Sequence, residues 1–234
     1  MVRQPTWIAF DVYASLVDRE AGAGRAFSEI LRRADAPQLD PNRVFNAWHH
    51  AVIRRYRTRF VGWKQAGREA MPEIRRRFRL RAGSADDIQI LYDSFPTWQP
   101  YPGVTELLRE LQARYRIAAV TNMDTDLFLS TSVGVEWDGW VTSELAGAYK
   151  PHPAIFDCAL ARFGCRREDL LWVGTTPWAD VLGARLADVP VVWLNRPRGQ
   201  SCGATHLRPW EPIPDHEIRE LGDLLALLGM GGVS

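Results

Sequence analysis

Five short runs of apolar residues recur along the chain, and most of them are rich in β-branched side chains. Continuous apolar runs of this length are typical of strands that are buried on both faces of a sheet. They cover residues 7–11, 117–121, 139–142, 170–174 and 191–195. The pattern therefore predicts five strands of one buried sheet.

Helical patterns lie between these runs from the second run onward. Residues 104–115 carry apolar side chains at helix spacing, and residues 153–164 begin with proline and end at glycine, as a helix should. Residues 179–188 form a third such pattern. Alternating strands and helices predict an α/β fold with a Rossmann-like, three-layer core and a parallel sheet. After Arg196 the chain is loop-rich until a short helix predicted near 215–229.

The interval between the first two strands breaks this alternation, because it contains no convincing buried strand. The pattern there predicts helices, which cover roughly 19–34, 41–59, 63–80 and 84–94. Pro41 stands at a first helical position, and Ser84 is a good N-cap. We therefore expect two domains: a core of residues 1–15 and 99–234, and an inserted all-helical cap domain of residues 16–98.

The composition is that of an ordinary globular protein. The 234 residues are 46% hydrophobic and carry a net charge of +1, with no apolar run long enough for a membrane span, so we expect neither a membrane nor a nucleic-acid partner. Arginines cluster at 54–59 and 75–81, where a solvated helix face is favoured over a nucleic-acid patch. Cys158, Cys165 and Cys202 form no CxxC pair, and we expect them to be inert in a reduced, cytoplasmic protein.

Chemically capable residues follow the ends of the predicted strands. In an open parallel sheet, ligands bind beyond the carboxyl ends of the strands, which meet at one edge. Two carboxylates, two hydroxyls, an amide and a lysine are expected to converge there. They belong to Asp11, Thr121, Asn122, Lys150, Thr175 and Asp180.

Four segments at these strand ends resemble the four motifs of the haloacid dehalogenase superfamily. They are FDVYASL (10–16), VTN (120–122), AYKPHPAIF (148–156) and VGTTPWADVLGA (173–184). Each motif alone is a weak signal, but four in order, together with the early helical insert, span nearly the whole chain. The resemblance implies a hydrolase in which Asp11 is the nucleophile and forms a covalent ester.

Two positions distinguish the branches of this superfamily. Its phosphatases resemble one another in carrying an aspartate, which acts as the general acid, where Tyr13 stands. They usually also carry an acidic magnesium ligand where Thr175 stands. The sequence instead resembles the L-2-haloacid dehalogenases, which implies hydrolysis of a short (S)-2-haloacid, such as haloacetate or 2-halopropionate, with no metal or other cofactor. Mg²⁺ is expected only if the protein is a phosphatase.

The same resemblance implies the catalytic roles. Asp11 attacks the α-carbon and expels halide, and water then cleaves the ester. Lys150 keeps Asp11 ionised, and Ser15 donates a hydrogen bond to it. Asp180 positions Lys150 and helps activate the water.

The substrate pocket, which takes a small-molecule carboxylate, is expected between the strand ends and the insert. Its residues are Thr121 and Asn122 for the substrate carboxylate, Tyr13, Trp63 and Trp178 for an apolar wall, Arg43 for the halide, and Thr175. A dry pocket strengthens attack by a carboxylate that water would otherwise solvate. Related enzymes also pair through the cap, which implies a homodimer.

Three departures from the family motifs leave other activities open. Ala14 replaces a glycine, Phe156 a tyrosine, and Pro177 an asparagine that orients the water or the halide. One alternative is another hydrolysis at a carbon next to a carboxylate, such as ring opening of a cyclic amino acid. A magnesium-dependent small-molecule phosphatase and a non-catalytic binder of small acids are the others, although the intact nucleophile and its partners argue against the binder.

Overall fold

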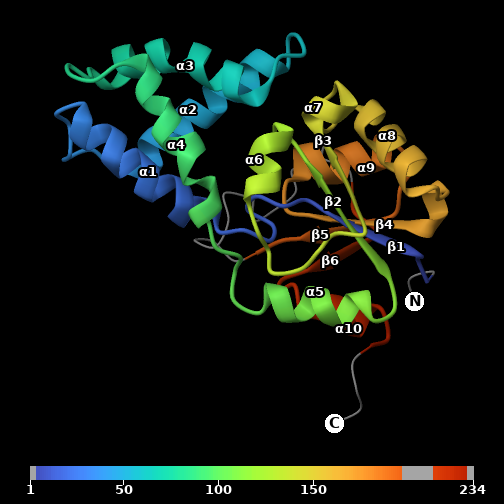
Figure 1. Ribbon diagram of the computed structural model, residues 1–234. Coiled ribbons are helices and arrows are strands. Elements are labelled where there is room, and N and C mark those ends of the chain that lie inside the picture. Colours follow the sequence, from blue (N-terminus) through green and yellow to red (C-terminus); the bar gives the residue numbers. More distant parts are fainter. Residues whose placement is uncertain (1–3, 197–212, 231–234) are drawn as a thin grey trace.

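One parallel sheet forms the centre of the molecule (Figure 1). The computed structural model describes residues 4–196 and 213–230. In sheet order the strands are β3 (Gly139–Thr142), β2 (Arg116–Thr121), β1 (Trp7–Phe10), β4 (Leu170–Gly174), β5 (Val191–Leu194) and β6 (His216–Ile218). The five strands predicted from apolar runs are confirmed. Because β1 lies between β2 and β4, the residue that follows β1 stands at the middle of the carboxyl edge.

The short helix predicted near 215–229 is present, but a sixth strand that was not predicted precedes it. Residues His216–Ile218 form β6 and pair in parallel with β5, and the helix α10 covers only Asp223–Leu227. A three-residue strand is too short to show an alternating pattern, and its pairing with β5 is a tertiary contact that local sequence does not encode.

Helices cover both faces of the sheet, as Figure 1 shows. Helix α5 (Val104–Gln112) and α10 lie on one face, and α8 (Pro153–Phe163) and α9 (Leu182–Leu186) lie on the other. Successive side chains of β1 accordingly enter two separate apolar clusters, Ile8 with the first pair of helices and Ala9 with the second. The core is therefore the expected three-layer α/β arrangement. Two short helices were not predicted, α6 (Thr125–Ser130) and α7 (Ser143–Ala146).

The predicted helical insert is also confirmed. It contains α1 (Arg19–Arg33), α2 (Pro41–Tyr56), α3 (Trp63–Phe78) and α4 (Gln89–Ser94), with single helical turns at Ala85–Ile88 and Phe95–Thr97. Asp18 and Asp40 cap the first two helices through their side chains. Figure 1 shows these helices as a separate layer beyond one end of the sheet. We call residues 16–98 the cap and the rest of the chain the core.

The chain crosses between core and cap twice, and the two crossings lie side by side. The amide of Asp18 donates to the carbonyl oxygen of Gln99 at 2.9 Å, and the amide of Tyr101 donates to that of Leu16 at 2.8 Å. These bonds tie the entry and exit of the cap together.

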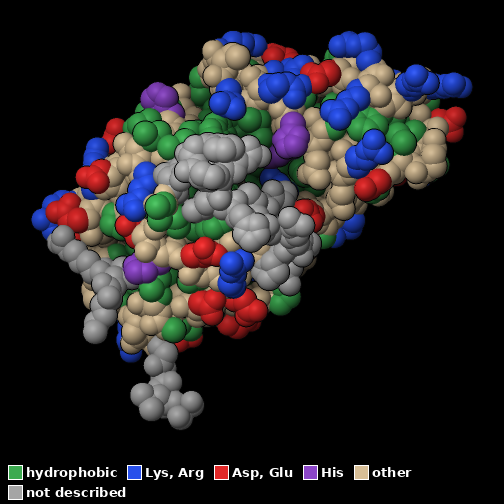
Figure 2. All heavy atoms as spheres, turned by 180° about the vertical axis from the view of Figure 1, so that it is seen from behind, with side chains coloured by type: hydrophobic (Ala, Val, Ile, Leu, Met, Phe, Trp, Pro, Cys, Tyr) green, Lys and Arg blue, Asp and Glu red, His purple; other side chains and the backbone are tan. Residues whose placement is uncertain are grey.

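Basic side chains gather along the upper edge of the molecule in Figure 2, over the cap. Several are paired: Arg59 lies 3.1 Å from Glu69, and Arg55 lies 3.3 Å from Glu73. Such exposed pairs are typical of a solvated helix face. Over the described ranges 4–196 and 213–230, no helix is both long and apolar enough to span a membrane.

Candidate active site

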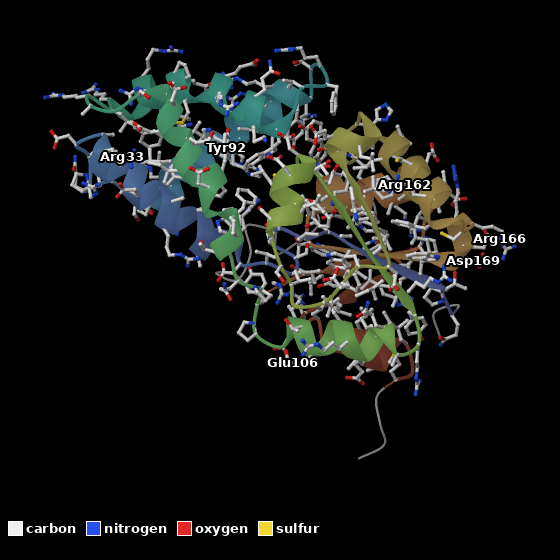
Figure 3. The ribbon with its side chains drawn as sticks, in the orientation of Figure 1. Arg33, Tyr92, Glu106, Arg162, Arg166 and Asp169 are labelled. Atoms are coloured by element: carbon white, nitrogen blue, oxygen red, sulfur yellow. The ribbon has the colours of Figure 1, made fainter. Side chains whose placement is uncertain are left out.

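The carboxyl ends of the central strands face the cap. Asp11 follows β1, Thr121 ends β2, and Thr175 follows β4. Figure 3 marks the opposite end of the sheet by Arg166 and Asp169, which precede β4 and lie far from the cap. The chemically capable residues predicted from the sequence therefore share the edge that the cap covers.

Lys150 bridges two carboxylates at this edge. Its Nζ donates hydrogen bonds to Asp11 Oδ1 and Asp180 Oδ1, both at 2.8 Å, and to the carbonyl oxygen of Val120 at 3.1 Å. Lys150 and Asp180 are each only 1% exposed, and Asp11 is 8% exposed. The second oxygen of Asp180 accepts the amide hydrogen of Thr176 at 2.8 Å. Both oxygens of Asp180 are thus engaged within the core.

Burial and charge act against each other in this cluster. Burial alone would lower the pKa of Lys150, but the carboxylates of Asp11 and Asp180 outweigh it and raise that pKa above its ordinary value. Burial raises the pKa of Asp180, and the attraction of Lys150 offsets this only in part. Lys150 therefore stays an ammonium ion and stabilises negative charge on Asp11.

Ser15 holds the second oxygen of Asp11. Its Oγ donates to Asp11 Oδ2 at 2.7 Å and lies 2.9 Å from Thr175 Oγ1. Thr175, which the sequence predicts to belong to the substrate pocket, is buried behind Ser15 and is not among the residues that line the cavity above Asp11. Thr175 instead contacts the hydroxyl of Ser15, and that hydroxyl in turn binds Asp11.

Ala14 explains one departure from the family motif. Its φ of 73° lies in the left-handed region, which favours glycine. The loop after β1 thus keeps the backbone conformation expected of a glycine, although an alanine stands there. This turn brings Ser15 back over Asp11.

Asn122 fixes the loop that carries Lys150. Its side-chain nitrogen donates to the carbonyl oxygen of Lys150 at 3.1 Å, and its side-chain oxygen accepts the amide hydrogen of Lys150 at 2.7 Å. The peptide bond between Lys150 and Pro151 is cis. Phe156, where the family has tyrosine, is buried against Trp172 on the far side of this loop and does not reach the cavity.

A cavity of about 100 Å³, the inner cavity, lies over Asp11 between core and cap. Five of the predicted substrate-side residues line it: Tyr13, Trp63, Thr121, Asn122 and Trp178. Tyr13 turns its hydroxyl away, to Thr131 Oγ1 at 2.9 Å, so its ring faces the cavity as an apolar surface. Tyr56, Phe95 and Trp98 add further aromatic rings. The inner cavity is therefore small and mostly apolar, with charge gathered around Asp11.

Arg43, which the sequence predicts to receive the halide, does not line this cavity. Arg43 is exposed, because α2 turns Phe45 and His49 to the cavity and position 43 lies about 200° around the helix from position 45. The arginine that lines the cavity is Arg19, the first residue of α1. Sequence register pointed to α2, whereas the packing of α1 against α2 brings the cation from a different helix.

Arg19 supplies a partly buried cation. Its Nε is buried and has no hydrogen-bond partner within the described part of the chain, and its guanidinium lies 5.6 Å from the ring centre of Phe45. Burial lowers the pKa of Arg19, although Asp11 opposes this, and an arginine remains charged in any case. An anion in the cavity would meet this guanidinium.

His49 is a cavity residue that no motif indicated. Its ring stacks on Phe45 with a centroid distance of 5.7 Å and an interplanar angle of 12°. Burial, reinforced by Arg19 and His50, holds the pKa of His49 well below its ordinary value. The imidazole is therefore neutral near pH 7. The helix spacing of Phe45, His49 and Ile53 is a signal that could have grouped them on one face.

The two carboxylates at this edge hold an ammonium ion between them. Lys150 Nζ lies at hydrogen-bond distance from both Asp11 and Asp180, where a cation would otherwise bridge them. Among the residues that the structure describes, no group of three or more His, Cys, Asp or Glu side chains is arranged to hold a metal ion.

Comparison with known proteins identifies the family. The model of the haloacid dehalogenase-like hydrolases matches residues 6–188, so this chain belongs to that family and is a hydrolase. The fold and the Asp–Lys–Asp cluster described above thus lie in a known class of enzymes.

Relatives within the family differ in activity. The chain is 28% identical over 204 residues to haloacetate dehalogenase H-2 of Moraxella sp., covering 81% of this chain and 85% of the relative. It is 29% identical over 227 residues to a phosphoserine phosphatase of Thermus thermophilus, covering 88% and 86%. A solved L-2-haloacid dehalogenase from Xanthobacter autotrophicus superposes with a TM-score of 0.80 at 18% identity, covering 99% of this chain and all of that one. The last comparison establishes the fold with its cap.

Proposed function

We propose that this protein hydrolyses short (S)-2-haloacids through an ester of Asp11 and without a metal ion. The observation that supports this most is the setting of Asp11: Lys150 binds one of its oxygens, Ser15 binds the other, and a small aromatic cavity lies over it. A volume of about 100 Å³ suits the reacting end of a small acid. The similarity to a haloacetate dehalogenase agrees with this choice.

In the first step, a carboxylate oxygen of Asp11 attacks the α-carbon. The new carbon–oxygen bond forms as the carbon–halogen bond breaks, and halide leaves with the bonding electron pair. The hydroxyl of Thr121 and the backbone amide of Asn122 bind the substrate carboxylate, and the Arg19 guanidinium receives the negative charge of the halide. Exclusion of water by the aromatic walls strengthens attack by a carboxylate. One in-line displacement inverts the α-carbon.

In the second step, water attacks the ester carbonyl carbon of Asp11. A proton passes from the water to a base, the alkoxide of the product takes up a proton, and Asp11 regains a carboxylate that contains the oxygen of the water. Lys150 offsets the negative charge that forms on the carbonyl oxygen. Asp180 positions Lys150, and the raised pKa of Asp180 suits a group that accepts a proton near neutral pH.

The cavity favours this reaction over the two other hydrolyses. A magnesium-dependent phosphatase needs a metal ion, held by carboxylates, to neutralise the phosphoryl group. Here the ammonium group of Lys150 occupies the space between the two carboxylates. Ring opening at a nitrogen needs a proton for the departing amine, whereas the cavity histidine, His49, is held neutral. Halide leaves as an anion and needs no proton.

Halide release tests the proposal. We expect release from (S)-2-chloropropionate in the presence of EDTA, and none from Asp11→Asn. The exposed carboxylate variant Asp126→Asn is the matched control and should keep the activity of the parent protein. A single turnover in H₂¹⁸O should leave the heavy oxygen in the Asp11 peptide rather than in the product. Phosphate release from a phosphomonoester that depends on Mg²⁺, with no halide release, would instead identify a phosphatase.

A further inference from the structure

A second, larger cavity adjoins the inner one. This outer cavity has a volume of about 570 Å³ and lies between the cap loop after α2 and the core loop around Lys150. Tyr56, Lys150 and Trp178 line both cavities, so the two spaces meet at these three side chains. A volume in the range of about 300–1,000 Å³ is usual for small-molecule sites. The outer cavity is therefore far larger than a two- or three-carbon acid requires.

The walls of the outer cavity are apolar at positions that are otherwise open to water. Phe60 is 46% exposed and Leu186 is 57% exposed, and both line it. Tyr56 and Tyr149 stack with ring centres 3.9 Å apart and form a continuous aromatic surface with Phe60. Exposed apolar side chains that gather around a cavity are typical of a binding surface.

The charges of the outer cavity are of one sign. Among the residues that the structure describes, its lining contains no Asp or Glu, but it contains Arg57 and Arg59. Arg59 is bound by Glu69, whereas Arg57 makes no ion pair with any described residue and lies over the ring of Trp178, 4.7 Å from its centre. The approach to Asp11 therefore carries, on an aromatic wall, a cation with no ion-pair partner among the described residues, which suits an acid with an apolar chain.

We propose that the outer cavity binds the chain beyond the α-carbon, so that 2-haloacids with a long alkyl or aryl tail are turned over by the same reaction more efficiently than the short acids named above. This inference rests on the proposed function. The reacting carbon and the carboxylate occupy the inner cavity over Asp11, and the tail passes Tyr56 and Trp178 into the outer cavity. Each methylene that leaves water for an apolar wall is expected to raise kcat/KM by up to about fourfold.

Chain length is the first test. We expect kcat/KM for 2-chlorooctanoate to exceed that for 2-chloropropionate at least about tenfold, because several methylenes reach the apolar walls. Leu186→Glu places a charge on the tail wall at an exposed position and should lower the ratio of these two values at least about fivefold. Leu129→Glu, at a position 61% exposed on α6 and outside both cavities, should leave the ratio unchanged. An equal or lower kcat/KM for the long acid, or an unchanged ratio in Leu186→Glu, would overturn the inference.

Binding of products separates this inference from the proposed function. Calorimetry with 2-hydroxyoctanoate and with lactate needs no turnover. Tighter binding of 2-hydroxyoctanoate that Leu186→Glu weakens would support the tail site even if no haloacid is turned over, in which case only the proposed reaction fails. Equal binding of the two hydroxy acids would overturn the tail site whatever the halide assay shows.

Discussion

Lys150 is a buried ammonium ion whose charge is balanced by two buried carboxylates. Replacing it by methionine keeps most of the length of the side chain but leaves Asp11 and Asp180 facing each other without a cation. Removal of one partner of a buried ion pair costs about 3–5 kcal/mol, and we expect Lys150→Met to lose that much unfolding free energy together with all activity. Urea unfolding measures the loss of unfolding free energy, and halide release measures the loss of activity. Lys64→Met breaks the more exposed pair with Asp126, where a loss of at most about 1 kcal/mol is expected. A similar loss in both variants would contradict this interpretation.

Arg19 and Arg43 form a natural pair for testing the anion site. Arg19 lines the inner cavity, and Arg43 is exposed on another face of the cap. We expect Arg19→Met to lower kcat/KM for 2-chloropropionate about 100-fold, because a charge-assisted contact contributes up to about 3 kcal/mol. Arg43→Met should leave kcat/KM within about twofold of the parent value. Steady-state kinetics of the two variants shows which arginine receives the halide. A lowered kcat/KM in Arg43→Met alone would support Arg43, the residue predicted from the sequence.

His49 should make stability depend on pH. Because its pKa in the folded protein is below the ordinary value of 6.5, the unfolded chain binds a proton there that the folded protein does not. Stability attributable to His49 is therefore complete above pH 6.5 and falls as the pH drops below that value, by at most about 1.4 kcal/mol per pH unit. Urea unfolding at pH 7.5 and pH 5.5 should show a smaller drop for His49→Gln than for the parent protein. An identical drop in both would show that His49 is not buried in its neutral form.

The sequence could predict the core side of the inner cavity but not its cap side. Asp11, Lys150 and Asp180 each follow a strand and belong to a local motif, so topology alone brings them together. Arg19 and His49 come from helices whose orientation is set by packing within the cap, and no local pattern shows which polar residue will be turned inward.

At the scale of elements, α3 lacks a cap from its own segment and receives one from the core. Its N-cap residue, Gly62, has no side chain to offer. Asp124, which follows β2, accepts the amide hydrogens of Trp63 at 2.6 Å and Lys64 at 2.9 Å instead. A carboxylate at a helix N-terminus stabilises both the free amides and the helix dipole. Asp124 therefore joins the cap to the core next to Trp63, a wall of the inner cavity.

Asp124→Ala should loosen this connection. We expect a loss of about 0.5–2 kcal/mol of unfolding free energy, the usual effect of a lost N-cap, and a raised KM because Trp63 is no longer held in place. Asp126→Ala removes a neighbouring but exposed carboxylate and should change the unfolding free energy by no more than about 0.5 kcal/mol. Urea unfolding and KM measured on both variants test this, and an unchanged KM in Asp124→Ala would show that the contact does not position Trp63.

The elements that the sequence missed share one property, which is shortness. Helices α6 and α7 have six and four residues, and β6 has three, so none is long enough for a periodic pattern. Each is held by contacts across the chain, as when the amide of Asn195 donates to the carbonyl oxygen of Ile218 beside β6. The long cap helices and the buried strands, in contrast, carry their pattern locally.

At the scale of the whole molecule, cap and core share one hydrophobic cluster. Phe27 and Trp48 of the cap belong to the same contiguous cluster as Ile117 and Leu194 of the core. Tyr13 joins the two halves, since its ring lies edge-on to Phe95 at 5.4 Å and to Trp98 at 5.8 Å between ring centres. An interface of this kind resembles the interior of a domain more than a contact between independent domains.

We therefore expect cap and core to unfold together. Chains of more than about 150 residues with two domains often unfold in separate steps, so a single transition is a specific outcome here. Calorimetry should give one peak whose calorimetric and van't Hoff enthalpies agree, and circular dichroism and tryptophan fluorescence should report the same midpoint. A lactate-type product that binds between cap and core should raise that midpoint without splitting it, because the ligand binds only the folded arrangement. Two resolved transitions, with only one of them shifted by the ligand, would show that the shared cluster does not couple the two parts of the chain.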